Sequence, residues 1–148
     1  MDKTKERQNW LSVLARSDRA SIERLARDQD LPEVETLRPA EVGLVMVRGR
    51  AGGTGQRFNV GELPVTRCSV RSATGHVGHG YVQGRDKAHA ELAATLDAAL
   101  QEPGRRLSLT EAVIEPLAAA LVDQKNAIEA KAAATKVDFF TMVRGESE

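Results

Sequence analysis

Charged residues that could bind an anion stand at a predicted strand-to-helix turn in the middle of the chain. The stretch Tyr81–Lys87 ends a β-prone segment, and Gly84 provides a permissive backbone for a turn. Asp86 is a suitable N-cap for the helical pattern that follows, and the free N–H groups of a helix start attract anions. Arg85 and Lys87 flank this point. The residues allow an anion site, but an ordinary strand-to-helix connection with solvated charges also explains them and is favoured on the residues alone.

A second candidate is the glycine-rich turn Gly52-Gly53-Thr54-Gly55, which separates two predicted strands. Successive backbone N–H groups in such a turn can form an anion-binding nest. Three basic residues are next to it: Arg48, Arg50 and Arg57. The stretch is not a P-loop, because neither Gly-Lys-Ser/Thr nor a helix follows it. A tight hairpin turn explains the glycines by itself, and the close approach of a ligand or of a partner's backbone is the alternative.

The sequence offers no complete catalytic or metal-binding set. Cys68 is the only cysteine, and the only histidines are His76, His79 and His89. His76 and His79 are three residues apart in a predicted strand and so face opposite sides, which argues against a shared metal ion. Asp86 and His89 share the first turn of one helix, where ordinary capping is the favoured explanation. We therefore expect no catalytic residue and no metal in this chain.

The charge of this 148-residue chain is balanced overall but unevenly distributed. Residues 48–87 contain seven basic and two acidic side chains, a net charge of +5, whereas residues 88–148 carry a net charge of −4. The positive middle suits a phosphate-bearing ligand or an acidic partner surface. Nucleic-acid binding is disfavoured, because no Lys/Arg block occurs and the aromatic residues are not interleaved with basic ones. The charged start and the lack of long apolar runs predict a soluble, cytoplasmic protein without signal peptide or membrane span.

The predicted elements form one domain, residues 1–148, of the α+β class. Residues 4–29 have the pattern of a helical hairpin whose second helix is capped by Ser17 or Asp18. An antiparallel β-meander is predicted over residues 33–83, and the strand 63–72 places Arg67 and Arg71 on one face. Its other strands are expected near 34–37 (closed by Arg38-Pro39), 42–51, 56–60 and 76–83.

Two helices are predicted after the sheet, at residues 86–101 and 117–135, and both are expected to pack on it. Pro103-Gly104 is expected to break the chain between them, and residues 110–115 are ambiguous between a short helix and an extended connector. The segment 137–145 that follows is unusually apolar for a chain end; it contains Phe139, Phe140, Met142 and Val143. Such a segment either docks on its own domain or lies in an interface, and the residues leave both possibilities open.

Several motifs carry a family resemblance over nearly the whole chain. They are Trp10 with Val13-Leu14-Ala15, Ala51–Gly55 with Arg57-Phe58, Thr66-Arg67 and Val70-Arg71, Tyr81–Lys87 with His89-Ala90-Glu91, and Val137–Gly145. In this order and spacing they resemble the PhnG family, the small subunits of the bacterial carbon–phosphorus lyase system. The last motif is the most specific of them.

The resemblance implies a cytoplasmic hetero-oligomeric core with PhnH, PhnI and PhnJ, joined transiently by ABC-type proteins such as PhnL and PhnK. It implies a part in the step in which an alkylphosphonate displaces adenine from the ribose C1 of ATP, giving ribose 1-phosphonate 5-triphosphate. The chemistry of this step is placed on PhnI. The iron–sulfur cluster and S-adenosylmethionine of the later bond cleavage belong to PhnJ. No catalytic residue of this chain is implied.

Two hypotheses follow from the residues and the resemblance together. The first is an accessory subunit that docks on PhnI through its apolar tail. In it, the glycine turn and the basic residues Arg57, Arg67, Arg71, Arg85 and Lys87 face either the polyphosphate or an acidic partner surface. The second is a free-standing nucleotide- or polyphosphate-binding protein, motivated by the charge asymmetry alone.

Overall fold

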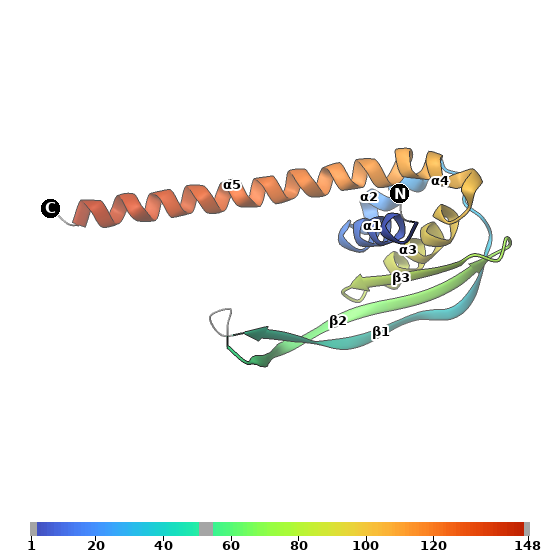
Figure 1. Ribbon diagram of the computed structural model, residues 1–148, viewed down its shortest axis with the longest axis horizontal. Coiled ribbons are helices and arrows are strands. Elements are labelled where there is room, and N and C mark those ends of the chain that lie inside the picture. Colours follow the sequence, from blue (N-terminus) through green and yellow to red (C-terminus); the bar gives the residue numbers. More distant parts are fainter. Residues whose placement is uncertain (1–2, 51–54, 147–148) are drawn as a thin grey trace.

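The computed structural model describes residues 3–50 and 55–146, and the side chains of the last helix as far as Thr135. Two helices, α1 (Lys3–Arg16) and α2 (Arg19–Ala26), precede a sheet of three antiparallel strands in the order β1-β2-β3. The strands are β1 (Val34–Arg50), β2 (Arg57–Ser72) and β3 (Val77–Gln83). The helices α3 (Lys87–Leu100) and α4 (Pro103–Leu109), a π-helical turn η2 (Thr110–Ile114) and α5 (Glu115–Glu146) follow. The predicted α+β class with an antiparallel meander is confirmed (Figure 1).

The sheet has fewer and longer strands than predicted. The predicted end at Arg38-Pro39 is wrong, because β1 continues through it and pairs with β2 on both sides. The register of β1 shifts between Arg38 and Glu41, so Pro39 lies where the ladder does not require its missing N–H. The predicted gap between residues 60 and 63 is also wrong, because Gly61 and Glu62 pair with Val47 and Met46.

The helix starts at Asp18 and Asp86 are as predicted. The carboxylate of Asp18 accepts the Ser21 N–H at 2.9 Å at the start of α2, and that of Asp86 accepts the His89 N–H at 3.1 Å at the start of α3. The predicted break between the helices is present, because α3 ends at Leu100, and Pro103 begins α4, where a proline loses no helical hydrogen bond. The ambiguous segment 110–115 is helical, mostly as the π-turn η2.

Helix α3 packs on the inner face of the sheet at very short range. Gly78 and Gly80 of β3 lie against the backbone of α3, where a Cβ on Gly80 would come within 1.9 Å of the Ala90 carbonyl oxygen. The facing residues of α3 are small as well: Ala90, Ala94 and Ala98 recur at every fourth position. This close approach, with buried residues such as Leu96 and Val82 around it, forms the centre of the core. We call α1–α4, η2 and the covered part of the sheet the body.

The last helix needs a correction. Helix α5 begins two residues before the predicted start and continues to Glu146, so it includes the segment expected to stand apart. It contacts η2 and α1 instead of lying on the sheet, because α3 already covers the inner face. As far as Thr135, where the described side chains end, only the first turns of α5 are packed: Leu117 is buried, Leu121 is half-buried, and residues 122–135 are exposed.

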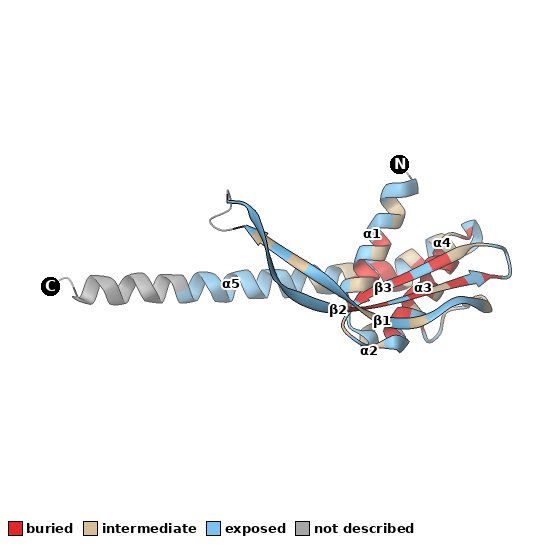
Figure 2. Ribbon diagram, turned by 90° about the horizontal axis from the view of Figure 1, so that it is seen from below, coloured by how far each residue is buried: buried red, intermediate tan, exposed pale blue. Residues whose placement is uncertain are grey.

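Two arms project from the same side of the body (Figures 1 and 2). The hairpin arm is the distal part of β1 and β2, residues 44–50 and 57–63, and the helix arm is α5 from Val122 onward. Buried residues are concentrated in the body, whereas nearly all described residues of the arms are exposed (Figure 2). The body is therefore a packed unit, and the arms lie outside its core.

Candidate functional site

At the start of α3, the position that could bind an anion is occupied by the carboxylate of Asp86. Besides capping the helix, the Asp86 carboxylate pairs with the Arg19 guanidinium at 3.4 Å. Gly84 supplies the turn with a φ of +104°, and its N–H donates to the Pro64 carbonyl at 2.8 Å. The side chain of His89 does not meet Asp86; its Nε2 hydrogen-bonds the Leu14 carbonyl at 2.9 Å. This turn therefore joins the sheet to both sets of helices, and Arg85 and Lys87 are exposed beside it.

A buried carboxylate that the sequence analysis missed organises the inner face. Asp97 of α3 is fully buried and binds the Arg7 guanidinium at 2.9 and 3.2 Å. It also accepts the Trp10 Nε1–H at 2.8 Å and the His79 backbone N–H at 2.9 Å. The pairing raises the pKa of Arg7, with the hydrogen bond to Asp97 as the largest cause. An aspartate between Leu96 and Ala98, inside the most apolar helix, was the available signal.

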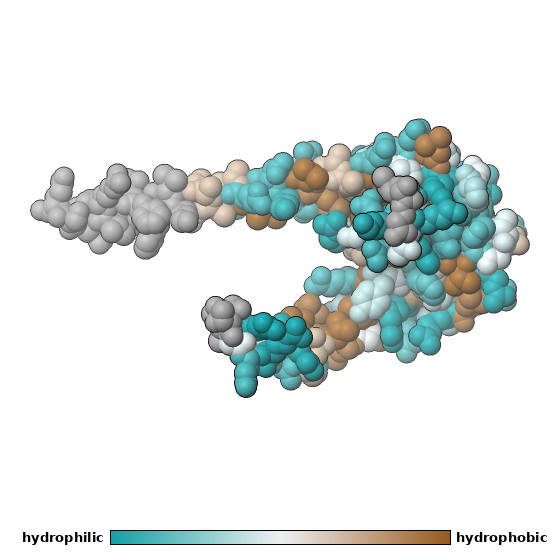
Figure 3. Space-filling model, viewed as in Figure 1, coloured by the Kyte–Doolittle hydropathy of each residue, from teal (hydrophilic) through white to brown (hydrophobic). Residues whose placement is uncertain are grey.

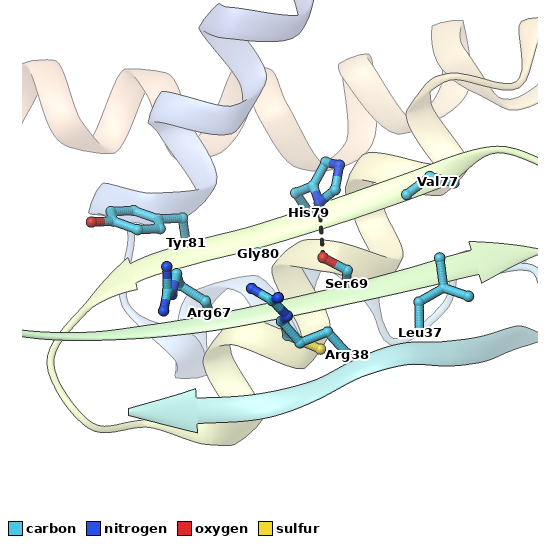
Figure 4. A pocket seen from close by; sticks show the side chains of 9 residues that line it. Leu37, Arg38, Arg67, Ser69, Val77, His79, Gly80 and Tyr81 are labelled. Atoms are coloured by element: carbon cyan, nitrogen blue, oxygen red, sulfur yellow. Dashed lines mark hydrogen bonds between the residues drawn. The ribbon is translucent and has the colours of Figure 1, made fainter. Parts of the chain in front are cut away.

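Arg67 and Arg71 lie on the outer face of β2, as predicted, because they alternate with the buried residues Thr66, Cys68 and Val70. Arg67 stands opposite Tyr81 of β3, and two positions along the strand Ser69 stands opposite His79. A shallow depression of about 600 Å³ is lined by Leu37 and Arg38 of β1 together with Arg67, Ser69, His79 and Tyr81, whereas Arg71 is not part of its lining. Figure 4 shows these side chains on one side of the sheet, with the Ser69 Oγ bonded to His79 Nδ1 at 2.9 Å.

The tip of the hairpin arm is a separate location. Gly52 and Gly53 lie outside the described residues, whereas Gly55 and Arg57 are described and exposed. Arg57 pairs with Arg50 across the hairpin. Ten residues of extended strand separate Arg57 from Arg67, roughly 33 Å. The candidate residues thus fall into three groups, at the arm tip, on the outer face and at the start of α3. Whether each group faces an anion or a partner stays a prediction.

A groove runs along the base of the two arms. One pocket lies between the α1–α2 corner and the base of the hairpin arm, and includes Val45, Leu63 and Tyr81. Two further pockets continue the groove through Arg16 to Leu121 and Ile128 of α5. Figure 3 shows this hollow between the arms, with apolar surface on both of them. We call it the fork groove.

Comparison with known proteins identifies the family. A family model described as "Phosphonate metabolism protein PhnG" matches residues 5–145. The chain belongs to the PhnG family. A protein of Rhizobium meliloti (strain 1021) named "Alpha-D-ribose 1-methylphosphonate 5-triphosphate synthase subunit PhnG" is 48% identical over 143 residues, which make up 95% of this chain and 90% of the relative. The family predicted from the sequence motifs is confirmed.

The motifs that carry the PhnG resemblance are spread over the fold. Trp10 and Val13-Leu14 belong to the core, and Tyr81–Lys87 connects β3 to α3. Arg57-Phe58 belongs to the hairpin arm, and Thr66-Arg67 and Val70-Arg71 to the part of β2 that the body covers. The segment 137–145 belongs to α5, but the side chains of Phe139, Phe140, Met142 and Val143 lie outside the described residues, so their predicted interface role is untested.

The metal-ligand types found in the sequence have other surroundings in the structure. His76 bonds Thr74 and His79 bonds Ser69, and His76 precedes β3 instead of lying within it. Cys68 is buried, and this burial raises the pKa of its thiol. Among the residues that the structure describes, no three His, Cys, Asp or Glu side chains are grouped as a metal site. None of the described helices is long and apolar enough to cross a membrane.

Proposed function

We propose that this chain is a subunit, not catalytic by itself, of the multi-subunit enzyme that makes ribose 1-methylphosphonate 5-triphosphate in phosphonate degradation. In that reaction a phosphonate displaces adenine from ATP, so ATP and the alkylphosphonate are substrates of the whole complex. The family membership and the 48% identical relative named as a synthase subunit support the assignment. The observation that carries the subunit role is the pair of arms, whose apolar surface is not covered by any residue that the structure describes.

The hairpin arm exposes more large apolar side chains than an isolated soluble domain needs. Leu44 is 60% exposed, Met46 53% and Val60 62%, and Phe58 and Leu63 are exposed near them. The helix arm adds Val122 and Ile128 at the other side of the fork groove. Contiguous apolar surface of this kind is typical of protein–protein contacts. A partner that enters the fork would bury side chains from both arms at once.

The buried polar groups of the body support an accessory role. Asp97 is saturated by Arg7, Trp10 and His79, and His89 holds the Leu14 carbonyl. Glu102 accepts the Thr74 hydroxyl and binds Arg105. Each of these groups therefore has a structural task within the body. Catalysis in the complex would then be carried by other subunits.

The finer assignment of partners rests on the family. We assign the fork and the tail of α5, with Phe139, Phe140, Met142 and Val143, to PhnI, within a cytoplasmic core that also contains PhnH and PhnJ and engages PhnL and PhnK transiently. The iron–sulfur cluster and S-adenosylmethionine of the pathway belong to PhnJ in this proposal. Residues 1–148 act in it as one domain. A free-standing nucleotide-binding protein is the weaker alternative, because the relative is named as a subunit.

Co-expression with PhnH, PhnI and PhnJ tests the proposal, with a tag on PhnI and size-exclusion chromatography with mass detection. The native chain is expected to co-elute with PhnI. The double variant Val45→Ser/Leu63→Ser is expected to be lost from the complex, because two side chains that line the fork groove on the hairpin arm become polar. Leu107→Ser is the matched control, since Leu107 is 70% exposed on α4, outside the fork groove.

The tail is tested separately with Phe139→Ser/Phe140→Ser. Loss of co-elution in this variant, with an unchanged circular dichroism spectrum of the lone chain, would support docking through the tail. Full assembly of both double variants would contradict docking through the arms. A native chain that never associates with the other subunits would overturn the subunit role itself.

A further inference from the structure

We infer that the outer face of the sheet holds a binding site for a triphosphate group, built by Arg38, Arg67, Ser69, His79 and Tyr81. The inference rests on the proposed function, because a 5-triphosphate is part of the compound for which the relative's enzyme is named. It adds a ligand site on this chain to a role that otherwise requires only docking. The site lies on the opposite face of the sheet from α3.

The register of the three strands brings these side chains together. Arg38 of β1 stands opposite Ser69 of β2, which stands opposite His79 of β3. Arg67 stands opposite Tyr81, one alternation further along the same face. All five line the depression of about 600 Å³, a size within the usual range for a small-molecule site. In Figure 4 the two arginine side chains extend over the sheet beside Ser69, with His79 and Tyr81 on the neighbouring strand.

The two arginines of the site form no ion pair with a described carboxylate. Arg7, Arg19 and Arg105 each form an ion pair with a carboxylate. The guanidinium groups of Arg38 and Arg67 have no hydrogen-bond or ion-pair partner among the residues that the structure describes. Glu41 stands opposite Arg67 in the register but is not part of the lining of the depression. Two guanidinium groups that line one depression repel each other, and a bound anion relieves this repulsion.

The donors suit a phosphate chain better than a single carboxylate. Each guanidinium offers five N–H donors in a planar fork that matches phosphate oxygens. Ser69 occupies Nδ1 of His79, so Nε2 is the ring nitrogen left for a ligand. A single carboxylate would satisfy the donors of only one of the two guanidinium groups. A triphosphate carries several charges on a short flexible chain and can engage both arginines together.

Calorimetric titration of the full chain with inorganic triphosphate tests the site. We expect saturable binding that weakens as salt is raised, because the contacts are solvent-exposed ion pairs. Arg38→Gln and Arg67→Gln should each weaken the affinity about tenfold or more, the cost of one lost charge-assisted contact. Arg27→Gln removes the same charge from the exposed end of α2 and should leave the affinity unchanged. ATP should bind about as tightly as inorganic triphosphate, because no described contact reads a base or ribose.

The same variants in the PhnI co-elution assay separate this inference from the proposed function. Loss of binding with normal assembly in Arg67→Gln is the expected result. An equal loss of affinity in Arg27→Gln would mean unspecific charge attraction and would overturn the site. Absence of triphosphate binding, with assembly weakened by Arg67→Gln, would instead assign this face to an acidic partner surface and also overturn it. If the lone chain precipitates, the titration compares native and variant chains within the assembled complex.

Discussion

Strand β2 belongs half to the body and half to the hairpin arm, and its two halves behave differently. From Val65 to Ser72 buried and exposed side chains largely alternate, whereas from Arg57 to Leu63 every side chain is exposed. Both halves pair with β1 in the same antiparallel ladder. The two halves differ in what packs against them, because α3 lies against the body half and no described residue lies against the arm half. The ladder thus sustains a strand without a core, and no residue that the structure describes covers the apolar side chains of the arm.

The residue types alone do not separate the two halves. Val60 and Leu63 in the arm are as apolar as Val65 and Val70 in the body. The separation comes from β3, which ends at Gln83 and so leaves the arm two strands wide. It also comes from the glycines of β3, which admit α3 to the body half only. We therefore expect matched substitutions to lower the free energy of unfolding strongly in the body and only slightly in the arms.

The largest expected effect is that of Gly80→Ala in the body. Its Cβ would lie 1.9 Å from the Ala90 carbonyl oxygen, so α3 would have to move away from the sheet. We expect the free energy of unfolding to fall by roughly 3 kcal/mol or more, or the chain not to fold. Gly61→Ala in the hairpin arm is the matched control, since a Cβ there meets nothing within 4 Å, and should change stability by about 0.5 kcal/mol or less. Urea unfolding followed by circular dichroism measures both.

Next in size is the removal of the buried carboxylate. Asp97→Ala leaves the Trp10 Nε1–H, the His79 N–H and the Arg7 guanidinium without their acceptor. We expect a loss of about 3 kcal/mol, below the upper range for buried ion pairs because Arg7 is partly exposed and can be solvated. Asp123→Ala, at an exposed position of the helix arm, should cost less than about 0.5 kcal/mol. Equal losses in these two variants would show that the network does not hold the body together.

The sequence was sufficient for the parts of the fold that depend on local signals. Caps at Asp18 and Asp86 and the apolar spacing of α3 were predictable, because each involves residues within one or two turns. The register shift at Pro39 was not, because a proline ends a strand or is absorbed in a bulge depending on its partner strand. Nor was the position of α5, which depends on how α3 already fills the inner face.

The candidate site was predictable only in part. Alternation placed Arg67 and Arg71 on one face, but Arg38, Ser69 and His79 join Arg67 only through pairing across three strands. Arg38 was not recognised as a site residue, because the strand was expected to end there. The role of Asp97 was overlooked because its partners Arg7, Trp10 and His79 come from distant parts of the chain. Two signals were present in retrospect: alternating glycines in β3 facing alanines at every fourth position of α3, and a carboxylate among the apolar residues of that helix.

A moderate effect is expected from Glu102, which joins α4 to the turn before β3. The Thr74 hydroxyl bond lowers its pKa below the ordinary value of 4.5, and Arg105 adds to this. A lowered folded pKa gives stability that is present above 4.5 and is lost as the pH falls through the folded value. Glu102→Gln should therefore cost about 1–2 kcal/mol at pH 7 and less at pH 3.

Urea unfolding between pH 7 and pH 3 checks the Glu102 prediction. The variant's stability should depend less on pH than that of the native chain. Some pH dependence should remain, because the pKa of Asp18 is also lowered by its hydrogen bonds to Ser21 and the variant keeps this contribution. Thr74→Ala should reproduce part of the effect, since it removes the largest cause of the shift. Parallel pH profiles for native and Glu102→Gln chains would contradict the assignment.

The smallest effect is expected at Val60 in the arm half of β2, where the comparison with the body half is sharpest. Val60 is 62% exposed in the arm and Val70 is 3% exposed in the body. Val60→Ser should change the free energy of unfolding by about 0.5 kcal/mol or less, whereas Val70→Ser should cost about 2 kcal/mol or more from lost apolar burial and an added buried hydroxyl. Native-state hydrogen exchange should rank the amides of residues 57–63 below those of 65–72, because a two-stranded ladder without a core opens more easily.

If PhnI binds the arms as proposed, the order of amide protection within β2 should change. The arm amides should gain protection and Val60→Ser should then weaken the complex, since the exposed valine becomes a buried one. Equal protection of both halves in the lone chain, with similar costs for the two serine variants, would mean that the arm is stabilised from within. The apolar surface of the arm would then no longer argue for a partner.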